Sequence, residues 1–475
     1  MKYFFLILFF FFGLSLNIFA QTVEINGFST QYSNDTLTFY TFDDLITNNE
    51  KELIKTLVND SGYFSCSFDL KETSLAYIYL GIYKGLIYFE PGKYYEIKLP
   101  DRKDKNIGDS LNPYFNETEL YLGIYNSNKD ELNFLIKKFD YFYDNYIQDK
   151  FYILYQQGYN SKVDTFITKL SNYFSFANNT YFSYYMKYKF AYLRYIAYER
   201  DLKFVTKEYY LNQAYLYNNT AYMTMFNLLY QNYFTYYSQT QDGENIFSDI
   251  ARAKSIYHLK KTLDNNISLS NDTLKELVIL KGLLDAFSPK NVGEYKSFPG
   301  PQLLQTLDSM IVLTKIPEHK HIAENIKKKV TKKRLIQGEK APEFELLNKD
   351  NEFVSLKSFS GKYLYLTFYS TWSYSCLKEI GLLKNIYDKH KKDIEIVTIF
   401  CDGTMQNMID IIEKNDYSWT FLHINDKTEI LKIYNIIVYP SYFLIDPYGE
   451  IILVPAPSPN EDFERNFFKI LNSRG

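Results

Sequence analysis

The pattern of apolar and polar positions changes twice along the chain and divides it into three parts. Residues 22–100 contain short segments in which apolar and polar residues alternate or apolar residues run together. Turn signals such as Pro91-Gly92 separate these segments. Such a pattern is typical of β-strands joined by tight turns. It predicts a small β-sandwich over residues 21–108.

The next part of the chain has helical periodicity and contains no proline between residues 114 and 288. Thr273-Leu-Lys-Glu276 has the spacing of a capping box and predicts the start of a helix there. We predict an α-helical domain over residues 112–335. Its clearest signal is a set of apolar residues three and four positions apart, as on one buried helix face: Leu132, Leu135, Ile136, Phe139 and Tyr143.

From Gly338 onward, predicted strands and helices alternate. A helix is expected after the turn at residues 372–376, and the chain ends in a two-stranded hairpin and a last helix. This order predicts an α/β domain over residues 336–475, with helices on both faces of its sheet. The main strands are expected at residues 363–369, 394–400, 419–424, 441–445 and 450–454.

The N-terminus has the pattern of a targeting segment. Lys2 is followed by an unbroken apolar run over residues 4–12, and Ala20 supplies a small residue before a cleavage point. We therefore predict a secretory signal peptide over residues 1–20 and an exported protein. An uncleaved N-terminal anchor is the alternative, although the apolar run is short for a membrane span.

The amino-acid composition limits the kinds of ligand and partner that we expect this protein to bind. Apolar residues make up 46% of the 475 positions, so a large core can form, and the formal net charge of −3 gives no basic excess for nucleic acid. His319 and His321 have no cysteine or paired carboxylates near them in the sequence, so we expect no metal site. No cofactor is predicted. Cys66 shares a strand face with Phe64 and Phe68 and is expected to be a small core residue.

The C-terminal part contains four short motifs: Gly338-x-x-Ala341-Pro342-x-Phe344-x-Leu346, Phe359-x-Gly361-Lys362, Phe368-Tyr-Ser-Thr-Trp372 and Val438-x-Pro440-x-x-Phe443-Leu-Ile-Asp446-x-x-Gly449. With these motifs it resembles the TlpA/ResA-like thioredoxin family of exported thiol-disulfide oxidoreductases. The resemblance implies a thioredoxin fold and a cis peptide bond at Pro440, facing the active-site motif. It also implies that Trp372, Tyr439 and Pro440 border a groove in which an extended peptide can pair with a free backbone edge.

The active-site motif departs from the family at its first cysteine. The family has Trp-Cys-x-x-Cys-x-x-Glu, whereas this chain has Trp372-Ser373-x-x-Cys376-x-x-Glu379. The first sulfur is the nucleophile that attacks a substrate disulfide, and the second resolves the mixed disulfide. A serine hydroxyl does neither. We therefore predict a degenerate active site that cannot carry out dithiol exchange.

Several interpretations of this motif remain open at this point. The domain can be a binding or scaffold module that keeps the fold and the peptide groove. Cys376 can act as a single thiol, with Glu379 as the proton shuttle that the resemblance implies, or can be a buried small residue. A peroxide-reducing site is a further alternative, but Tyr369 stands where that chemistry has a proline. Pairing of Cys376 with Cys401 also remains open.

Residues 60–70 (DSGYFSCSFDL) and 88–99 (YFEPGKYYEIKL) give the first two parts a resemblance to a known arrangement. A small β-sandwich precedes thioredoxin domains in many exported proteins of Gram-negative bacteria, and a helical region is found between them. The resemblance implies a location in the periplasm or cell envelope. It implies an extended peptide or a protein of the envelope as the partner, and membrane contact only if the signal segment is uncleaved.

Overall fold

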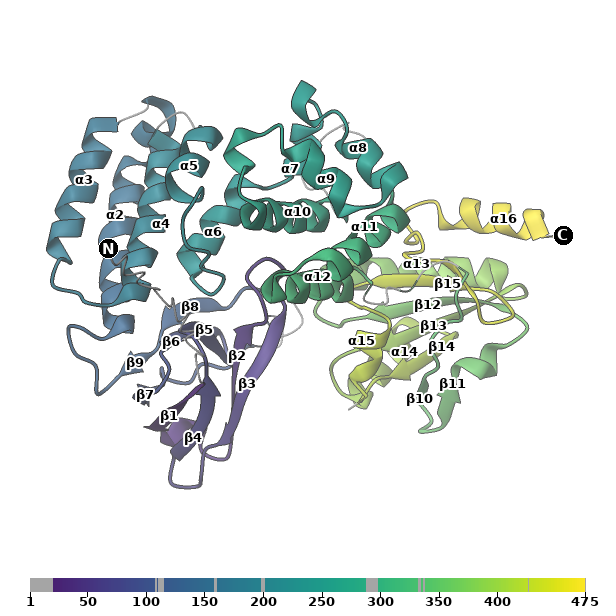
Figure 1. The fold of residues 1–475 in the computed structure, drawn as a ribbon. Helices are drawn as coiled ribbons and strands as arrows, with labels where there is room; N and C mark the ends of the chain where they lie inside the picture. The colour runs from purple at the N-terminus through teal and green to yellow at the C-terminus, as the bar shows by residue number, and fades with distance from the viewer. Residues whose placement is uncertain are drawn as a thin grey trace, which may run out of the picture. The chain divides into compact units, whose positions relative to one another are not determined.

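The structure is a computed structural model that describes residues 20–106, 109, 115–157, 160–197, 201–287, 298–331, 335, 338–425 and 427–474. The predicted signal segment lies outside the described residues, except for Ala20. The described chain forms two compact units (Figure 1). The first draws on Met1–Asp104 and Glu117–Val330, and the second on Lys105–Asn116 and Thr331–Gly475. In the described part of the chain, no helix has the length and apolar character needed to cross a bilayer.

Two β-sheets make up the N-terminal part of the first unit. Their strand orders are β4-β1-β7-β9 and β3-β2-β5-β6-β8. Apolar side chains from both sheets, such as Ile25 and Phe89, belong to one hydrophobic cluster, and Cys66 is partly buried against it. The strands are β1 (Gln21–Phe28), β2 (Thr36–Phe42), β3 (Glu50–Leu57), β4 (Tyr63–Leu70), β5 (Ser74–Leu80), β6 (Tyr83–Phe89), β7 (Tyr94–Lys98), β8 (Thr118–Tyr121) and β9 (Gly123–Ile124).

Two details of these sheets differ from the sequence prediction. Strand β3 was not predicted, because its sequence is largely charged and it lies at a sheet edge, where charged residues are common. Residues 118–124, assigned from sequence to the helical region, instead form β8 and β9, which pair with β6 and β7. The chain therefore returns to both sheets before the helices begin.

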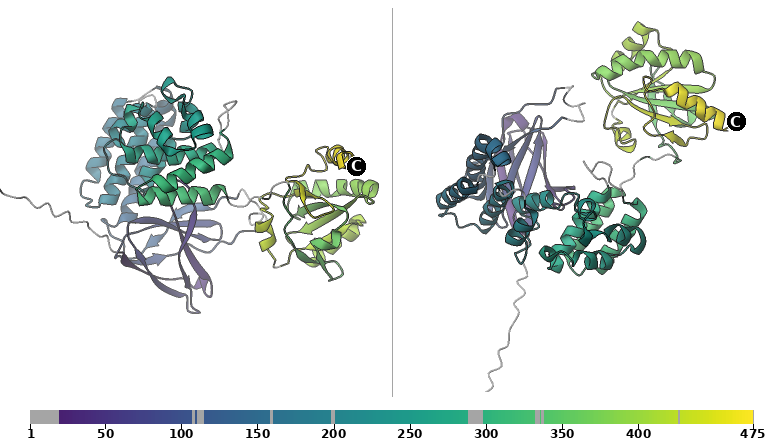
Figure 2. Two further views of the ribbon diagram at one scale, coloured as in Figure 1. Left: turned by 45° about the vertical axis from the view of Figure 1, so that its right-hand side comes forward. Right: turned by 90° about the horizontal axis from the view of Figure 1, so that it is seen from above.

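The helices of the first unit share a core with the sheets (Figure 2). Ile46 and Tyr88 from the sheet region belong to the helical cluster. The side chain of Asn133 hydrogen-bonds both backbone groups of Tyr88, at 2.6 and 2.9 Å. The helices are α2 (Leu132–Gln157), α3 (Asn160–Tyr173), α4 (Thr180–Ala197), α5 (Leu202–Tyr209), α6 (Thr220–Leu229), α7 (Tyr233–Tyr237), α8 (Ile246–Ser248), α9 (Ile256–Leu263), α10 (Asp272–Phe287), α11 (Gly300–Leu313) and α12 (Pro317–Val330).

The predicted capping box at the start of α10 is wrong. The backbone N–H groups of Thr273 and Leu274 donate to the side-chain oxygen of Asn271, which caps the helix in place of Thr273. Glu276 does not reach back to the cap. It is buried, and its carboxylate accepts hydrogen bonds from Lys260 and His319.

The second unit contains a seven-stranded sheet of order β11-β10-β14-β13-β12-β15-β16. Strands β12, β13 and β14 are parallel to one another, and the others pair antiparallel. The strands are β10 (Glu345–Asn348), β11 (Phe353–Ser355), β12 (Tyr363–Tyr369), β13 (Ile394–Phe400), β14 (Thr420–His423), β15 (Ser441–Ile445) and β16 (Ile451–Leu453), and the helices are α13 (Tyr374–His390), α14 (Met405–Asn415), α15 (Glu429–Ile433) and α16 (Phe463–Arg474).

Helices cover both faces of this sheet, as predicted. One hydrophobic cluster contains residues of α13, α14 and α16, including Ile380, Met408 and Phe467. The other contains Ile430 of α15 and residues of the segment that leads into the sheet. Strand β12 supplies both clusters because its side chains alternate between the two faces. Its near-continuous apolar sequence follows from burial on both sides.

Candidate functional site

The motif that begins at Trp372 lies after the C-terminal end of β12, where the chain turns into α13. Ser373 is the N-cap residue of α13, and its hydroxyl oxygen accepts a hydrogen bond from the backbone N–H of Cys376 at 3.4 Å. Serine is among the best N-cap residues, because its oxygen satisfies an otherwise unpaired N–H group. Ser373 is therefore well suited to begin the helix.

The same hydroxyl group links the motif to the predicted groove. Ser373 Oγ donates to the backbone carbonyl oxygen of Tyr439 at 3.1 Å. The Tyr439–Pro440 peptide bond is cis, as the resemblance implied. The structure thus brings together Ser373, Cys376 and the cis-proline segment.

Cys376 is a buried thiol. Only 1% of its surface is exposed, and its Sγ accepts the backbone N–H of Ser370 at 3.4 Å. Burial raises the pKa of Cys376 to about 11, and the hydrogen bond from the backbone N–H of Ser370 offsets this only in part. The negative charges of Asp402 and Glu379 raise the pKa further. The thiol is therefore protonated at neutral pH, in contrast to a reactive cysteine at a helix N-terminus.

Glu379 lies one turn along α13 and is held by strand β15. The hydroxyl group of Tyr442 donates to Glu379 Oε2 at 2.7 Å. Burial and this hydrogen bond raise the pKa of the Tyr442 hydroxyl well above its usual value. The carboxylate is thus fixed close to Cys376, where its charge disfavours a thiolate.

Large apolar side chains are exposed around the motif. Trp372 is 57% exposed, directly before the N-cap. Tyr439 is half-buried, and its side chain packs against both hydrophobic clusters of the second unit. The side chain of Tyr439 is therefore turned towards the interior, and Pro440 is half-buried. The other exposed apolar residues of the motif and of the segment before Pro440 are Tyr374, Leu377, Ile433 and Ile437.

Cys376 and Cys401 do not pair. Both are free thiols, and they belong to the two different hydrophobic clusters of the second unit. Cys401 Sγ donates to the carbonyl oxygen of Ile399, and burial raises its pKa well above the usual value. Cys401 is thus a core residue on the α15 side of the sheet.

Asp402 is a site residue that the sequence analysis missed. It lies two residues after the end of β13, and its carboxylate accepts three hydrogen bonds from the segment between β12 and the motif. The sequence offered one signal for Asp402, namely its place just after a predicted parallel strand. The carboxyl ends of parallel strands meet at one edge of a sheet, where ligands bind in such folds.

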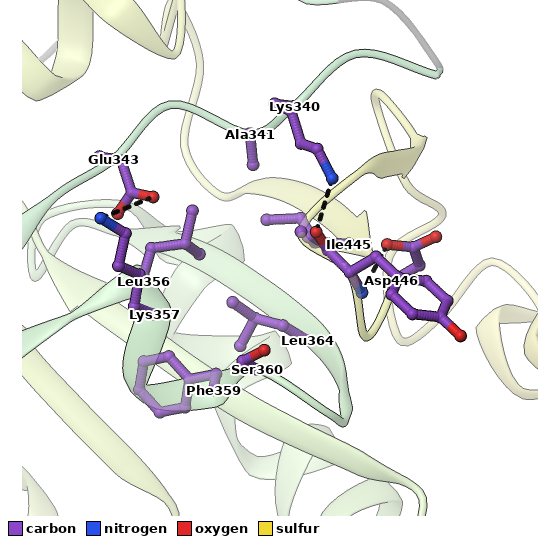
Figure 3. Close-up of a pocket in the computed structure, with 12 residues that line it drawn as sticks. Lys340, Ala341, Glu343, Leu356, Lys357, Phe359, Ser360, Leu364, Ile445 and Asp446 are labelled. Carbon is purple, nitrogen blue, oxygen red and sulfur yellow. Dashed lines mark hydrogen bonds and ion pairs between the residues drawn. The ribbon is translucent and has the colours of Figure 1, made fainter.

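A separate cavity lies elsewhere in the second unit, and none of the predicted site residues lines it (Figure 3). Its volume is about 350 Å³, and its apolar wall includes Leu356 and Leu364. The lysines at its rim are engaged: Lys340 Nζ donates to the carbonyl oxygen of Tyr448 at 2.8 Å, and Lys357 lies 4.0 Å from the Glu343 carboxylate. Among the described residues, no group of three or more His, Cys, Asp or Glu side chains is placed to hold a metal ion.

Comparison with known proteins places the site in a family. The sequence model of the AhpC/TSA family matches residues 337–454. Thiol-disulfide oxidoreductase ResA from Bacillus thuringiensis is 33% identical over 135 residues, which cover 28% of this chain and 78% of the relative, and ResA from Bacillus cereus gives the same values. A solved thioredoxin domain of a thiol-disulfide oxidoreductase from Bacteroides vulgatus is 25% identical and covers 29% of this chain and 98% of its own, with a TM-score of 0.27.

Three features of the second unit define a thioredoxin-fold protein. Its sheet has parallel strands at the centre and helices on both faces, the motif lies at a helix N-terminus, and a cis-proline lies opposite the motif. More closely, the chain belongs to the AhpC/TSA thioredoxin-fold family, with the ResA/TlpA-like thiol-disulfide oxidoreductases as its relatives.

Proposed function

We propose that this protein does not carry out dithiol exchange and that its thioredoxin-like domain is a binding or scaffold module for an extended peptide or a protein partner. The observation that carries the proposal is the bonding of Ser373. Its hydroxyl group is used by the backbone of Cys376 and of Tyr439, so it serves as a helix cap and a link to the cis-proline segment. No disulfide can form within this motif, because a disulfide needs two sulfur atoms.

The state of Cys376 argues against the single-thiol alternative. A thiol that attacks a disulfide or a peroxide needs access and a thiolate fraction at neutral pH. Cys376 has neither, since it is 1% exposed and its pKa is raised to about 11.

The burial and the raised pKa of Cys376 predict that this thiol is alkylated slowly in the folded protein. A pKa of about 11 in place of the ordinary 9.0 lowers the thiolate fraction at pH 8 by about a hundredfold. We expect iodoacetamide to modify Cys376 in the folded protein at least about a hundredfold more slowly than in urea, as followed by mass spectrometry of the Cys376 peptide. Equal rates in the two conditions would restore the single-thiol interpretation.

The exposed surface around the motif supports peptide binding. Trp372 is exposed beside the Ser373 cap, and the half-buried Pro440 follows Tyr439, whose carbonyl oxygen accepts the hydroxyl group of Ser373. An exposed aromatic side chain that is buried on binding is a common source of binding energy.

We therefore expect Trp372→Ala to weaken the binding of a fluorescein-labelled, reduced and carboxymethylated lactalbumin, used as an unfolded probe, by about thirtyfold in anisotropy titrations. The matched control is Phe353→Ala, which removes a side chain that is 64% exposed on β11 and should leave the affinity unchanged. Pro440→Thr, which changes the groove itself, should also weaken binding. Equal affinity of wild type and Trp372→Ala would exclude this surface as the binding site.

The remaining parts of the proposal concern location and the N-terminal region. We propose export to the periplasm or cell envelope, on the basis of the pattern in residues 1–20. The shared core of the two N-terminal sheets supports a small β-sandwich, which we propose as a module that precedes the helical domain. Fractionation of cells that produce the full chain, with N-terminal sequencing of the protein recovered, tests export and cleavage together.

A further inference from the structure

The turn between β12 and the motif is fixed by a single carboxylate. Asp402 Oδ2 accepts the hydroxyl group of Ser370 at 2.5 Å. Asp402 Oδ1 accepts both the backbone N–H of Thr371, at 2.9 Å, and its hydroxyl group, at 2.8 Å. Three donors from two consecutive residues therefore converge on one side chain that lies just beyond the end of the neighbouring strand β13.

Ser370 in this turn also hydrogen-bonds both parts of the site, the thiol of Cys376 and the backbone of Trp372. The backbone N–H of Ser370 donates to Cys376 Sγ at 3.4 Å, and Ser370 itself is 1% exposed. The hydroxyl oxygen of Ser370 accepts the backbone N–H of Trp372 at 3.3 Å. One continuous set of hydrogen bonds thus runs from Asp402 through Ser370 to the thiol and to the exposed tryptophan.

We propose that Asp402 is the positioning residue of this site, because it fixes the turn that presents Trp372 and keeps the Cys376 thiol covered. The part of the proposal that concerns Trp372 rests on the proposed peptide-binding function. The part that concerns the thiol does not.

A carboxylate is the side chain best suited to this task. It only accepts hydrogen bonds and offers about four lone-pair positions, so it can serve all three donors at once. Asparagine has nearly the same shape but only one acceptor oxygen, so it can keep the two bonds from Thr371. The charge of Asp402 has a further effect, because it opposes thiolate formation at Cys376.

The experiment compares Asp402→Ala, Asp402→Asn and wild type in the full chain. The loss of one hydrogen bond to a charged acceptor is expected to shift an opening equilibrium by about tenfold or more. We expect Asp402→Ala to raise the alkylation rate of Cys376 in the folded protein at least about tenfold, and to increase the mobility of Trp372 in time-resolved fluorescence anisotropy. Asp402→Asn should leave the mobility of Trp372 close to wild type. Its alkylation should rise only through the lost charge, as a shift of the pH profile to lower pH.

The matched control is Asp410→Ala, which removes an exposed carboxylate from α14 that does not contact the turn. Thr371→Val is a second variant in case Asp402→Ala does not fold, since it removes only the hydroxyl bond to Asp402. It should raise the alkylation rate about threefold or more. Unchanged alkylation in a folded Asp402→Ala protein, or in Thr371→Val if the alanine variant does not fold, overturns the proposal. Altered alkylation with no probe binding in wild type supports the role of Asp402 and rejects peptide binding.

Discussion

Ser373→Cys is expected to convert this protein into an active dithiol reductase. The new thiol would stand at the N-cap of α13, where unpaired N–H groups and the helix dipole stabilise a thiolate and bring its pKa to about 7 in thioredoxin. The thiolate fraction at pH 7 would then be about one half, compared with about one in ten thousand for Cys376. Reduction of insulin with dithiothreitol as electron donor should rise at least about a hundredfold over wild type.

The rate of insulin reduction by Ser373→Cys measures whether the other residues of the site can still support dithiol exchange. Cys376 already lies within hydrogen-bonding distance of the N-cap side chain through its backbone N–H, so it is placed to resolve a mixed disulfide. The control is the double variant Ser373→Cys with Cys376→Ala, which should accumulate a mixed disulfide without turnover. A wild type that reduces insulin rapidly, with activity lost in Cys376→Ala, would refute the proposed function. No gain in Ser373→Cys would show that more than one residue separates this site from its active relatives.

Wild type and the Ser373→Cys variant differ in one atom, the oxygen or sulfur of the side chain at the N-cap of α13. The serine oxygen accepts one hydrogen bond and donates another, which a larger and weaker hydrogen-bonding sulfur would not reproduce equally well. The wild-type residue is therefore expected to make the motif more rigid than a reduced cysteine would. Rigidity lowers the ordering cost of binding, which favours a binding surface over a reaction centre.

The C-terminal fold could be predicted well from the sequence because its central strands are buried on both faces. The predicted strands at residues 363–369, 394–400 and 441–445 coincide with β12, β13 and β15. Apolar runs bounded by polar turns leave little doubt about where such strands begin and end. Strand β3 could not be predicted in this way, since its charged edge sequence has no apolar periodicity.

The site was only partly predictable, because several of its properties arise from tertiary contacts. The missing thiol at Ser373 could be read from the sequence, and the cis bond before Pro440 followed from the resemblance. The burial of Cys376 and the inward turn of Tyr439 could not be read in the same way. The role of Asp402 depends on the pairing of β13 with β12, which brings residues about thirty positions apart in the sequence into contact.

Glu276 in the first unit is another residue whose role depends on tertiary contacts. The sequence predicted a capping role for it, and the structure gives it different partners. Its carboxylate accepts hydrogen bonds from Lys260 at 2.5 Å, Thr314 at 2.7 Å and His319 Nδ1 at 2.9 Å, and only 5% of its surface is exposed. Because His319 donates through Nδ1, its Nε2 can accept the hydroxyl group of Tyr217 at 3.0 Å when the ring is neutral. The network therefore joins α9, α10 and α12.

Glu276→Gln is expected to destabilise the first unit by about 3 kcal/mol at pH 7, because it leaves buried donors without a charged acceptor. Burial raises the pKa of Glu276, but the hydrogen bonds from His319, Lys260 and Thr314 outweigh it and lower the pKa to about 2. A depressed carboxyl pKa stabilises the folded state above the unfolded value of about 4.5. That contribution is lost as the pH falls from about 4.5 towards 2.

The difference in unfolding free energy between wild type and Glu276→Gln should therefore be largest at neutral pH and shrink below about pH 4. Both tryptophans, Trp372 and Trp419, lie in the second unit, so far-UV circular dichroism follows the helices while tryptophan fluorescence follows the thioredoxin-like domain. Urea titrations at several pH values should show the change in the first signal only. Glu324→Gln, an exposed carboxylate on α12, is the matched control. A pH-independent loss in Glu276→Gln would mean that the residue acts through packing and not through its charge.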